Sequence, residues 1–361
     1  MIETRNLLCN KKLNKLFIFL IGIFLIACSG DDGKDGLSGL DGLDGLDGLN
    51  GNTGPAAVLI VPDEIEDIQQ AIDSLTIGGG GTVYIKAGEY RLSKGIHIQH
   101  SNITILGEQG TLIKLNNDVN QPVILIGSDE EVPTERIENI KVECLEIDGN
   151  KDSQSSERDP NRTWIRNNGI DVRMVKDLYV SEVDIHHARS GGLVVSWNSS
   201  LIFIDKSSFH HNYYDGIALY ASEDIQVSNF FCNDNQAAGL SLDNDLKYVM
   251  FSVGTIRNNG DVGIFARHSK ELKFQSLEIA NNQSHGCFLS HESYGTGTGV
   301  NRLTFNSCSF IENNGYGYWL ATPVSESKNN SVIACLFSGN TQDAIEVPAD
   351  GALDLTGNIF Q

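Results

Sequence analysis

Three stretches of the chain align without a gap: CNDNQAAGLSLDN (232–244), IRNNGDVGIFARH (256–268) and IANNQSHGCFLSH (279–291). In each stretch an apolar residue comes first, an asparagine stands three residues later, and a glycine stands seven residues later. The first and third residues after the glycine are apolar, as expected of a β-strand with one buried face. The alignment therefore predicts a fold built from repeated strand units.

The repeat extends well beyond these three copies. The glycine position recurs at steps of 23 and 24 residues and then continues at two longer steps: Gly169, Gly192, Gly216, Gly239, Gly263, Gly286, Gly317 and Ala344. The apolar position that precedes it recurs as Ile185, Phe209, Cys232, Ile256, Ile279, Phe310 and Phe337. A fixed period in the low twenties with several short strands is typical of a solenoid.

The asparagine position predicts how neighbouring coils are joined. It recurs on six coils as Asn212, Asn235, Asn259, Asn282, Asn313 and Asn340. Stacked side-chain amides can hydrogen-bond from one coil to the next across the strand spacing of ~4.8 Å. We therefore predict an all-β fold, a right-handed parallel β-helix of about ten coils.

The segment before the repeats predicts a short helix that covers the first coil. Pro62 and Asp63 are expected to open and cap it, with Glu66 at the capping-box spacing. Four residues form one apolar stripe and Gly78 to Gly81 end the helix; the stripe is Ile65, Ile68, Ile72 and Leu75. Further strands are expected at 82–85, 96–98, 103–106 and 123–126.

The N-terminal residues are typical of an export signal. Basic residues precede an apolar run that ends in Leu25-Ile26-Ala27-Cys28, so residues 1–27 are predicted to be a signal peptide. The ending resembles a bacterial lipobox, which implies that Cys28 is lipidated and anchors the protein to a membrane. Ser29 and the following aspartates resemble signals for the outer membrane, with the cell surface as a further expectation.

Residues 28–57 are expected to form a tether between that anchor and the β-helix of residues 58–361. Glycine occupies every third position from Gly30 to Gly54, the period of collagen-like chains. Proline is missing from the intervening positions until Pro55, so a flexible or weakly trimerising tether and a triple-helical stalk both stay open.

The net charge bears on the partner of the protein, and the cysteine positions bear on its core. The formal net charge of -21 makes nucleic acid an unfavourable partner, because a polyanion would be repelled. Five of the seven cysteines are scattered through the repeats and are expected to be buried thiols that act as small hydrophobic residues. Cys308 and Cys335 share a column on adjacent coils, so a disulfide between them stays open as an alternative.

The second and fourth residues after each repeat glycine must face outward, because side chains alternate along a strand. Three consecutive coils place an aromatic ring at the second position: Phe265, Phe288 and Trp319. Ionisable and polar residues occupy the fourth position and the one after it. The catalytic candidates are Tyr220, Asp243, Arg267, His268 and His291, and the binding candidates are Arg173, Trp197, Asn244 and the three aromatic residues.

Two long insertions border the same face. One lies before Gly169, within NKDSQSSERDPNRTW (150–164), and the other, HESYGTGTGV (291–300), follows the strand at Gly286. Long loops in a compact fold are usually functional. A surface lined by loops, aromatic rings and charges suits an extended polysaccharide. His186, His187, His210 and His211 are expected in turns away from this face, and no metal site is assigned to them.

The stretches GGGGTVYIKAGEYRLS (78–93), ILGEQGTLIKL (105–115) and LEIDGNKD (145–152) resemble the opening of pectin-lyase-like β-helix proteins, in particular the catalytic modules of alginate C5-epimerases. That resemblance implies a uronate-containing polysaccharide as substrate. In those epimerases an Asp-Pro-His tripeptide stands on an outward strand. Here the matching residues are Val194-Val195-Ser196, so epimerase activity is not carried over.

Three functions follow from these expectations. A lyase would use an arginine to bind the uronate carboxylate, with Tyr220, His268 or His291 to move protons and Asp243 to orient one of them. A glycoside hydrolase would need two carboxyl groups, and Asp245 is the partner nearest to Asp243 in sequence. A non-catalytic glycan-binding or scaffold protein is the third. The cofactor is unknown; calcium at Asp243 to Asp245 would be compatible with the residue types but matches no known loop spacing.

Overall fold

The computed structural model describes residues 57–361 except 291–298, 322–326 and 349–352. The predicted signal peptide, Cys28, the Gly-x-y tether and His291 lie outside the described residues. Residues 57–361 form one compact unit. Within the described part of this unit, no helix has the length and apolarity needed to span a membrane.

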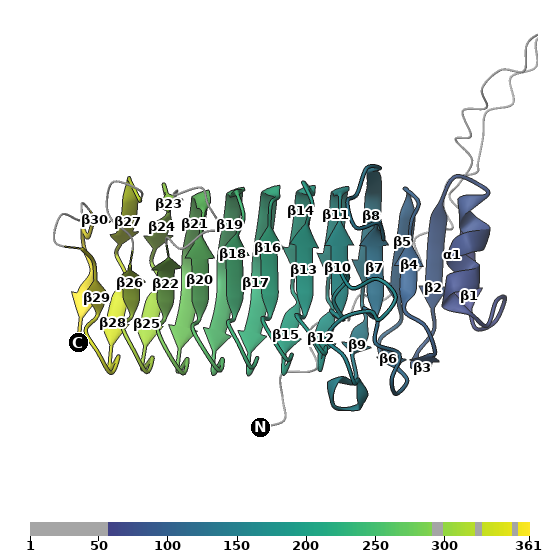
Figure 1. The fold of residues 1–361 in the computed structure, drawn as a ribbon, viewed down its shortest axis with the longest axis horizontal. Coiled ribbons are helices and arrows are strands. Elements are labelled where there is room, and N and C mark those ends of the chain that lie inside the picture. The colour runs from purple at the N-terminus through teal and green to yellow at the C-terminus, as the bar shows by residue number, and fades with distance from the viewer. Residues whose placement is uncertain (1–56, 291–298, 322–326, 349–352) are drawn as a thin grey trace, which may run out of the picture. The chain divides into compact units, whose positions relative to one another are not determined.

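Short strands wind into a parallel β-helix whose coils succeed one another from β1 to β31 (Figure 1). All named strand pairs in the described residues are parallel, for example Tyr220 opposite Asp243 and Phe265 opposite Phe288. One face is a ten-stranded sheet, whereas the larger sheet stacks twelve strands in succession within the described residues, so the β-helix has about twelve turns instead of the predicted ten. The strands of the ten-stranded sheet are β4 (Ile96–Ile98), β7 (Ile124–Gly127), β10 (Ile170–Arg173), β13 (Leu193–Ser196), β16 (Ile217–Tyr220), β18 (Leu240–Asp243), β20 (Ile264–Arg267), β22 (Cys287–Ser290), β26 (Tyr318–Leu320) and β29 (Ile345–Glu346).

The remaining strands form a 21-stranded sheet that bends around the rest of each coil. They are β1 (Ala57–Val61), β2 (Gly81–Ile85), β3 (Gly88–Leu92), β5 (Ile103–Gly107), β6 (Thr111–Leu115), β8 (Ile137–Glu143), β9 (Glu146–Asp148), β11 (Val175–Ser181), β12 (Asp184–His186), β14 (Ser200–Asp205), β15 (Ser208–His210), β17 (Glu223–Asn233), β19 (Leu246–Arg257), β21 (Ser269–Ala280), β23 (Val300–Asn301), β24 (Thr304–Asn306), β25 (Ser309–Ile311), β27 (Asn330–Ile333), β28 (Leu336–Ser338), β30 (Leu353–Asp354) and β31 (Ile359–Phe360).

The core consists of columns of apolar side chains that stack along the helix axis. The two residues predicted to point inward on β20, Ile264 and Ala266, are fully buried. Aromatic rings stack in the same way on the larger sheet, where Phe251 and Phe274 have centroids 5.3 Å apart. Because each coil covers the apolar edge of its neighbour, the repeat period translates directly into a continuous core.

The asparagine column forms the predicted ladder. The side-chain amide Nδ2 of Asn259 donates to Oδ1 of Asn282 at 2.9 Å, and Nδ2 of Asn235 donates to Oδ1 of Asn259 at 3.0 Å. Nδ2 of Asn259 also donates to the carbonyl of Cys232, and the backbone N–H of Asn235 donates to Oδ1 of Asn259. Asn259 is fully buried, so these bonds satisfy its side-chain amide and connect three coils.

The capping helix is present but begins later than predicted. Helix α1 spans Ile68–Thr76 and is capped by Asp67, whose carboxylate accepts from the N–H of Gln70 at 2.8 Å. Residues 62–66 form a turn instead, in which the N–H of Glu64 donates to the carbonyl of Ile60. Asp63 is paired with Lys86 rather than with a helix terminus. The predicted cap at Asp63 was therefore wrong by four residues, because this turn precedes the helix.

Candidate active site on the ten-stranded sheet

The outward face of the ten-stranded sheet brings three predicted site residues into one row. Tyr220 at the end of β16 lies opposite Asp243 at the end of β18. Nε of Arg267, at the end of β20, donates to Oδ2 of Asp243 at 2.8 Å, and a terminal guanidinium nitrogen contacts the same oxygen. The Asp243 side chain is only 5% exposed, whereas that of Arg267 is 23% exposed. Asp243 thus orients Arg267, and the guanidinium remains the more accessible partner.

Tyr220 carries its proton at neutral pH. Its hydroxyl lies 3.2 Å from the hydroxyl of Ser241. Burial raises the pKa of Tyr220, and the nearby negative charges of Asp215 and Asp243 raise it further. The hydroxyl is therefore protonated at neutral pH, as a donor to a leaving oxygen must be, while its raised pKa makes it a weaker acid than a free phenol.

Two aspartates on the same face titrate close to neutral pH. Burial raises the pKa of Asp215, which precedes β16, to about 6, and Asp261 adds to the effect. The carboxylate of Asp215 accepts from the N–H of Ala238 at 3.0 Å. Burial also raises the pKa of Asp171, on β10, to about 7, despite its hydrogen bond to Asn168 and the charge of Arg173. Carboxyl groups with such pKa values can act as bases or acids near neutral pH.

The insertion between β9 and β10 brings an arginine to these groups. The positive charge of Arg166 partly offsets the rise in the pKa values of Asp171, Asp215 and Tyr220. The Arg166 side chain is 41% exposed and pairs with the carboxylate of Glu157 at 3.9 Å, and its guanidinium carbon lies 5.4 Å from the ring centroid of Tyr214. This arginine is therefore a partly exposed cation that acts electrostatically on two carboxyl groups and a phenol.

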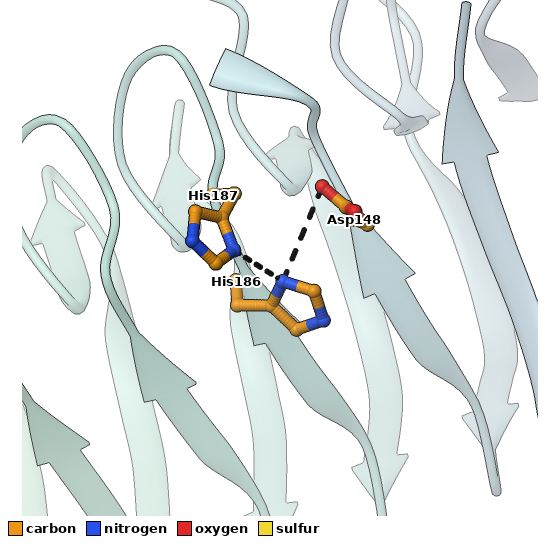
Figure 2. A group of neighbouring side chains, drawn as sticks. All are labelled: Asp148, His186 and His187. Carbon is orange, nitrogen blue, oxygen red and sulfur yellow. Dashed lines mark hydrogen bonds and ion pairs between the residues drawn. The ribbon is translucent and has the colours of Figure 1, made fainter. Parts of the chain in front are cut away.

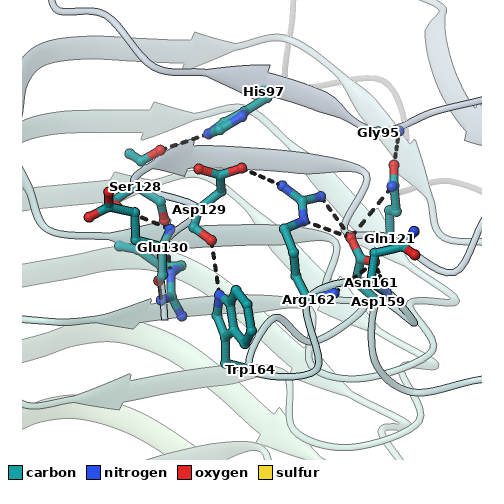
Figure 3. A network of polar contacts seen from close by, with 12 residues as sticks. Gly95, His97, Gln121, Ser128, Asp129, Glu130, Asp159, Asn161, Arg162 and Trp164 are labelled. Carbon is teal, nitrogen blue, oxygen red and sulfur yellow. Dashed lines mark hydrogen bonds and ion pairs between the residues drawn. The ribbon is translucent and has the colours of Figure 1, made fainter. Parts of the chain in front are cut away.

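A polar network holds the insertion in place (Figure 3). Arg162 contacts the carboxylates of Asp159 and Asp129 at 2.7 and 2.8 Å. Nε1 of Trp164 donates to the carbonyl of Asp129 at 2.9 Å, so the insertion is joined to the loop that follows β7. Asp159 is completely buried. These ion pairs and this hydrogen bond fix the position of the segment that precedes Arg166.

The predicted aromatic column is continuous and larger than expected. The ring centroids of Phe265 and Phe288 are 6.0 Å apart, and those of Phe288 and Trp319 are 4.7 Å apart. His285 and Tyr316, from the turns before β22 and β26, pack against Trp319 at 4.7 and 5.8 Å. The three column residues are half-buried, so they present ring surface beside Arg267.

The other predicted site residues are distributed around this face. Arg173 is buried and donates to the carbonyl oxygens of Ser128 and Glu130, so its guanidinium supports a loop. Trp197 is half-buried, with its ring 5.5 Å from the Arg173 guanidinium carbon.

Asn244 and His268 follow the strand ends and adopt left-handed backbone conformations, with φ of 59° and 43°. Asn244 is exposed and donates its N–H to Oδ1 of Asp243. Because Asp243 already pairs with Arg267, its carboxylate faces a cation, which is unfavourable for calcium at Asp243 to Asp245.

Sequence reasoning did not assign a role to Arg166, Asp171 or Asp215. Asp171 stood in the outward column, so a search for carboxyl groups along that column would have found it. Arg166 and Asp215 lie in the connections that precede strands β10 and β16. Side-chain alternation applies only within a strand, so it does not predict which way these two side chains point. Their proximity depends on the path of the insertion.

A surface pocket also exists on the larger sheet. It has a volume of about 440 Å³ and is lined by strands β14, β17, β19 and β21, with Phe203, Tyr248, Met250 and Lys273 among its residues. The groups that could transfer protons beside an accessible arginine lie on the ten-stranded sheet instead, which we therefore take as the candidate site.

Comparison with known proteins identifies the family. Residues 92–250 and 199–360 match the family model described as the right handed beta helix region, so the matches together span most of the chain. The chain belongs to the right-handed β-helix family. The predicted pectin-lyase-like resemblance, including the handedness of the coil, is confirmed.

The related proteins act on polysaccharides. A mannuronan C5-epimerase of Azotobacter vinelandii is 28% identical over 221 residues, covering 56% of this chain and 21% of the epimerase. Alginate lyase 7 of the same organism is 30% identical over 182 residues, covering 48% of this chain and 20% of the lyase. The chain thus matches about a fifth of the length of these relatives.

The similarity extends to a solved structure. The A-module of an Azotobacter vinelandii mannuronan C-5 epimerase superposes with a TM-score of 0.55 at 18% identity, covering 81% of this chain and 92% of the module. At this level of identity the superposition establishes a shared fold.

Proposed function

We propose that this protein cleaves a uronate-containing polysaccharide outside the cell by β-elimination. One observation carries the proposal. Tyr220, with a raised pKa, and Asp215, with a pKa of about 6, share one outward face with the accessible cations Arg166 and Arg267. The polysaccharide-acting relatives support the same class of substrate.

Each group has a role in the elimination. The arginines neutralise the uronate carboxylate, which makes the proton on the adjacent C5 more acidic. The carboxylate of Asp215 removes that proton, and the electron pair forms a double bond between C5 and C4. The bond between C4 and the bridging oxygen breaks, and the Tyr220 hydroxyl donates its proton to that oxygen. Asp243 positions Arg267 through their ion pair.

The aromatic residues provide the binding surface. Sugar rings have apolar faces that pack on aromatic rings. Phe265, Phe288 and Trp319 form such a surface beside Arg267, whose guanidinium carbon lies 5.5 Å from the Phe265 ring centroid. A polymer chain lying along this column would present successive uronate units to the basic residues.

The test is an assay of a panel of uronate polymers for two products. Elimination gives an unsaturated uronate that absorbs ultraviolet light, together with a new reducing end. The rate is expected to rise with pH through about 6, because the base must be deprotonated and the Asp215 pKa is about 6. If no member of the panel yields the unsaturated product, the β-elimination proposal is wrong.

Hydrolysis is the second candidate, and a specific observation favours it. Asp171 and Asp215 are both carboxyl groups with raised pKa values on the outward side of the ten-stranded sheet. A hydrolase requires two carboxyl groups on either side of the scissile bond. New reducing ends without ultraviolet absorbance would select this mechanism. Binding without any product would leave a glycan-binding scaffold, and conversion without chain cleavage would indicate an epimerase.

The location of the protein is part of the proposal. The Leu25-Ile26-Ala27-Cys28 ending and the residues after it support a lipid anchor on Cys28 and an outer-membrane location. The Gly-x-y tether would then separate the β-helix from the membrane, and it supports a possible trimer. Incorporation of labelled palmitate that is lost in Cys28→Ser tests the anchor, and the molecular mass in detergent tests the trimer.

A further inference from the structure

Four histidines form a two-by-two array outside the candidate active site. His186 ends β12 and His210 ends β15 on the next coil, where the two are directly opposite in register. Each is followed by a second histidine, His187 and His211. The rings of His186 and His210 stack with centroids 5.1 Å apart, and those of His187 and His211 stack at 5.5 Å. The array belongs to the 21-stranded sheet, on a different face from Tyr220.

Within each coil the two histidines turn the same ring atom toward each other. The Nδ1 atoms of His186 and His187 are 2.7 Å apart, and those of His210 and His211 are 2.8 Å apart. Such a contact requires one proton between two nitrogen lone pairs, so each pair is a ready chelate once that proton is displaced. Imidazole nitrogen is a preferred ligand of first-row transition metals.

The first pair differs from the second because a carboxylate completes it (Figure 2). Oδ1 of Asp148, at the end of β9, lies 4.0 Å from Nδ1 of His186. One ligand atom from each of Asp148, His186 and His187 falls within 4.8 Å of the others. On the far side of His210 the register position is held by Asn233, and the next residue, Asp234, acts on His211 electrostatically; among the described residues only the first pair forms a ligand group with a carboxylate.

Outer contacts already orient two of these ligands. Nε2 of His186 lies 3.2 Å from Oε1 of Glu146, which favours a proton on Nε2 and leaves the Nδ1 lone pair for coordination. Asp148 accepts from Lys114 through Oδ2 and from the N–H of Asn150 through Oδ1. A carboxylate on the remote nitrogen of a ligating histidine is the usual supporting arrangement at metal sites.

The charged groups around the histidine array favour the binding of a cation. Three carboxylates approach the array, from Glu146, Asp148 and Asp184, the last of which lies 2.8 Å from Nε2 of His210. Two ammonium groups oppose them: Lys114 is paired with Asp148, and Lys151 donates to the carbonyl of His211. His186 and Asp148 are both buried, so their charges are poorly screened by solvent.

We propose that Asp148, His186 and His187 bind one divalent transition-metal ion such as Zn²⁺. Bonds of about 2.0–2.1 Å to nitrogen require ligand atoms about 3.3 Å apart in a tetrahedral site. The two Nδ1 atoms would separate slightly, the Asp148 carboxylate would approach, and the His187 proton would move from Nδ1 to Nε2. Three protein ligands leave a fourth position for water, and the ion links the coil of β9 to that of β12.

The next coil offers a matched control for the test. His187 and His211 both adopt left-handed backbone, with φ of 51° and 56°, which asparagine tolerates. The full chain is titrated with Zn²⁺ in a chelator competition, alongside His187→Asn and His211→Asn. We expect one tightly bound equivalent in the wild type and a loss of affinity of about 100-fold in His187→Asn. His211→Asn should change the affinity by less than about threefold, because it lacks the carboxylate partner.

A Co²⁺ spectrum of the wild-type chain provides a second readout that does not depend on variants. Visible bands of four-coordinate Co²⁺ without a thiolate charge-transfer band are expected for nitrogen and oxygen ligands. A strong thiolate band would place the ion on cysteines such as Cys308 and Cys335 and overturn the proposal. Absence of stoichiometric Zn²⁺ uptake, or equal losses in the two variants, would overturn it as well.

Discussion

In the asparagine ladder and on the outward face of the ten-stranded sheet, equivalent positions of successive coils lie next to one another. The ladder repeats one residue type at its position, whereas the outward face changes residue type from coil to coil. In the ladder, identical amides repeat from Asn212 to Asn340, and each satisfies the next. On the outward face, Tyr220, Asp243 and Arg267 succeed one another at a similar spacing, and each differs from its neighbours. Identical residues in register stabilise the coil, whereas different residues in register bring unlike chemical groups together.

The comparison teaches where function can arise in a solenoid. A column whose members must bond to their own kind cannot change at one coil without leaving a buried partner unsatisfied. An outward column carries no such constraint, so a phenol, a carboxylate and a guanidinium can be neighbours. Four substitutions test this contrast.

The largest expected effect is on catalysis at Tyr220. Tyr220→Phe keeps the ring but removes the hydroxyl that would protonate the leaving oxygen, so the rate of elimination should fall about 1000-fold. The measurement is the initial rate of ultraviolet absorbance on the best polymer of the panel. Tyr248→Phe is the control, because that tyrosine is exposed on the larger sheet. Full activity in Tyr220→Phe would mean that another group is the acid.

The next effect is on stability in the ladder. Asn259→Ala removes the hydrogen bonds to Asn282 and to the carbonyl of Cys232, and it removes the oxygen that accepts from both the backbone N–H and the side-chain amide of Asn235. The free energy of unfolding should drop by about 3 kcal/mol in a denaturant titration. Asn314→Ala, at an exposed position on another coil, should cost less than about 0.5 kcal/mol. Equal losses in the two variants would contradict the special role of the ladder.

A pH-dependent gain in stability is expected at Asp171. Burial raises the pKa of its carboxyl group in the folded state to about 7, well above the ordinary value of an aspartate, so the folded state resists ionisation. As pH rises from 4 toward 7 the unfolded chain binds fewer protons than the folded one, and the wild type loses stability. Asp171→Asn should therefore raise the free energy of unfolding by about 2 kcal/mol at pH 8 and change it little at pH 4.

Unfolding curves at both pH values make this test. Asp177→Asn, an exposed aspartate on β11, should have the same small effect at both. A gain at Asp171→Asn that does not depend on pH would show that the carboxyl group is not the source.

The smallest effect is on substrate binding at the aromatic column. Trp319→Ala should raise KM about fivefold and leave kcat nearly unchanged, because the ring contributes packing area rather than chemistry. Tyr248→Ala on the larger sheet should leave both constants unaltered. A change in kcat with an unaltered KM would move Trp319 from the binding surface into the catalytic machinery.

Periodicity predicted the coil well because every repeat supplies the same evidence again. The inward positions and the amide ladder both follow from one spacing. The cap of α1 is a contrasting case: the sequence predicted Asp63, and the turn at 62–66 moves the start of the helix so that Asp67 caps it instead. The row of Tyr220, Asp243 and Arg267 was predictable for the same reason as the ladder.

The rest of the candidate site was not predictable in this way. Arg166 comes from an insertion with no counterpart in the other coils, and its position depends on the network of Arg162, Asp159 and Asp129. Arg173 stood in an outward column, yet its guanidinium is bound to loop carbonyls that no periodicity locates.

The sequence by itself determined the winding, the register and the identity of the stacked columns, since side-chain alternation and a fixed period are local properties that repeat. Only the tertiary structure decided which connections meet above the strands, and so which charges surround Tyr220. The physical reason is that loop positions are set by contacts between distant segments, and each such contact occurs once.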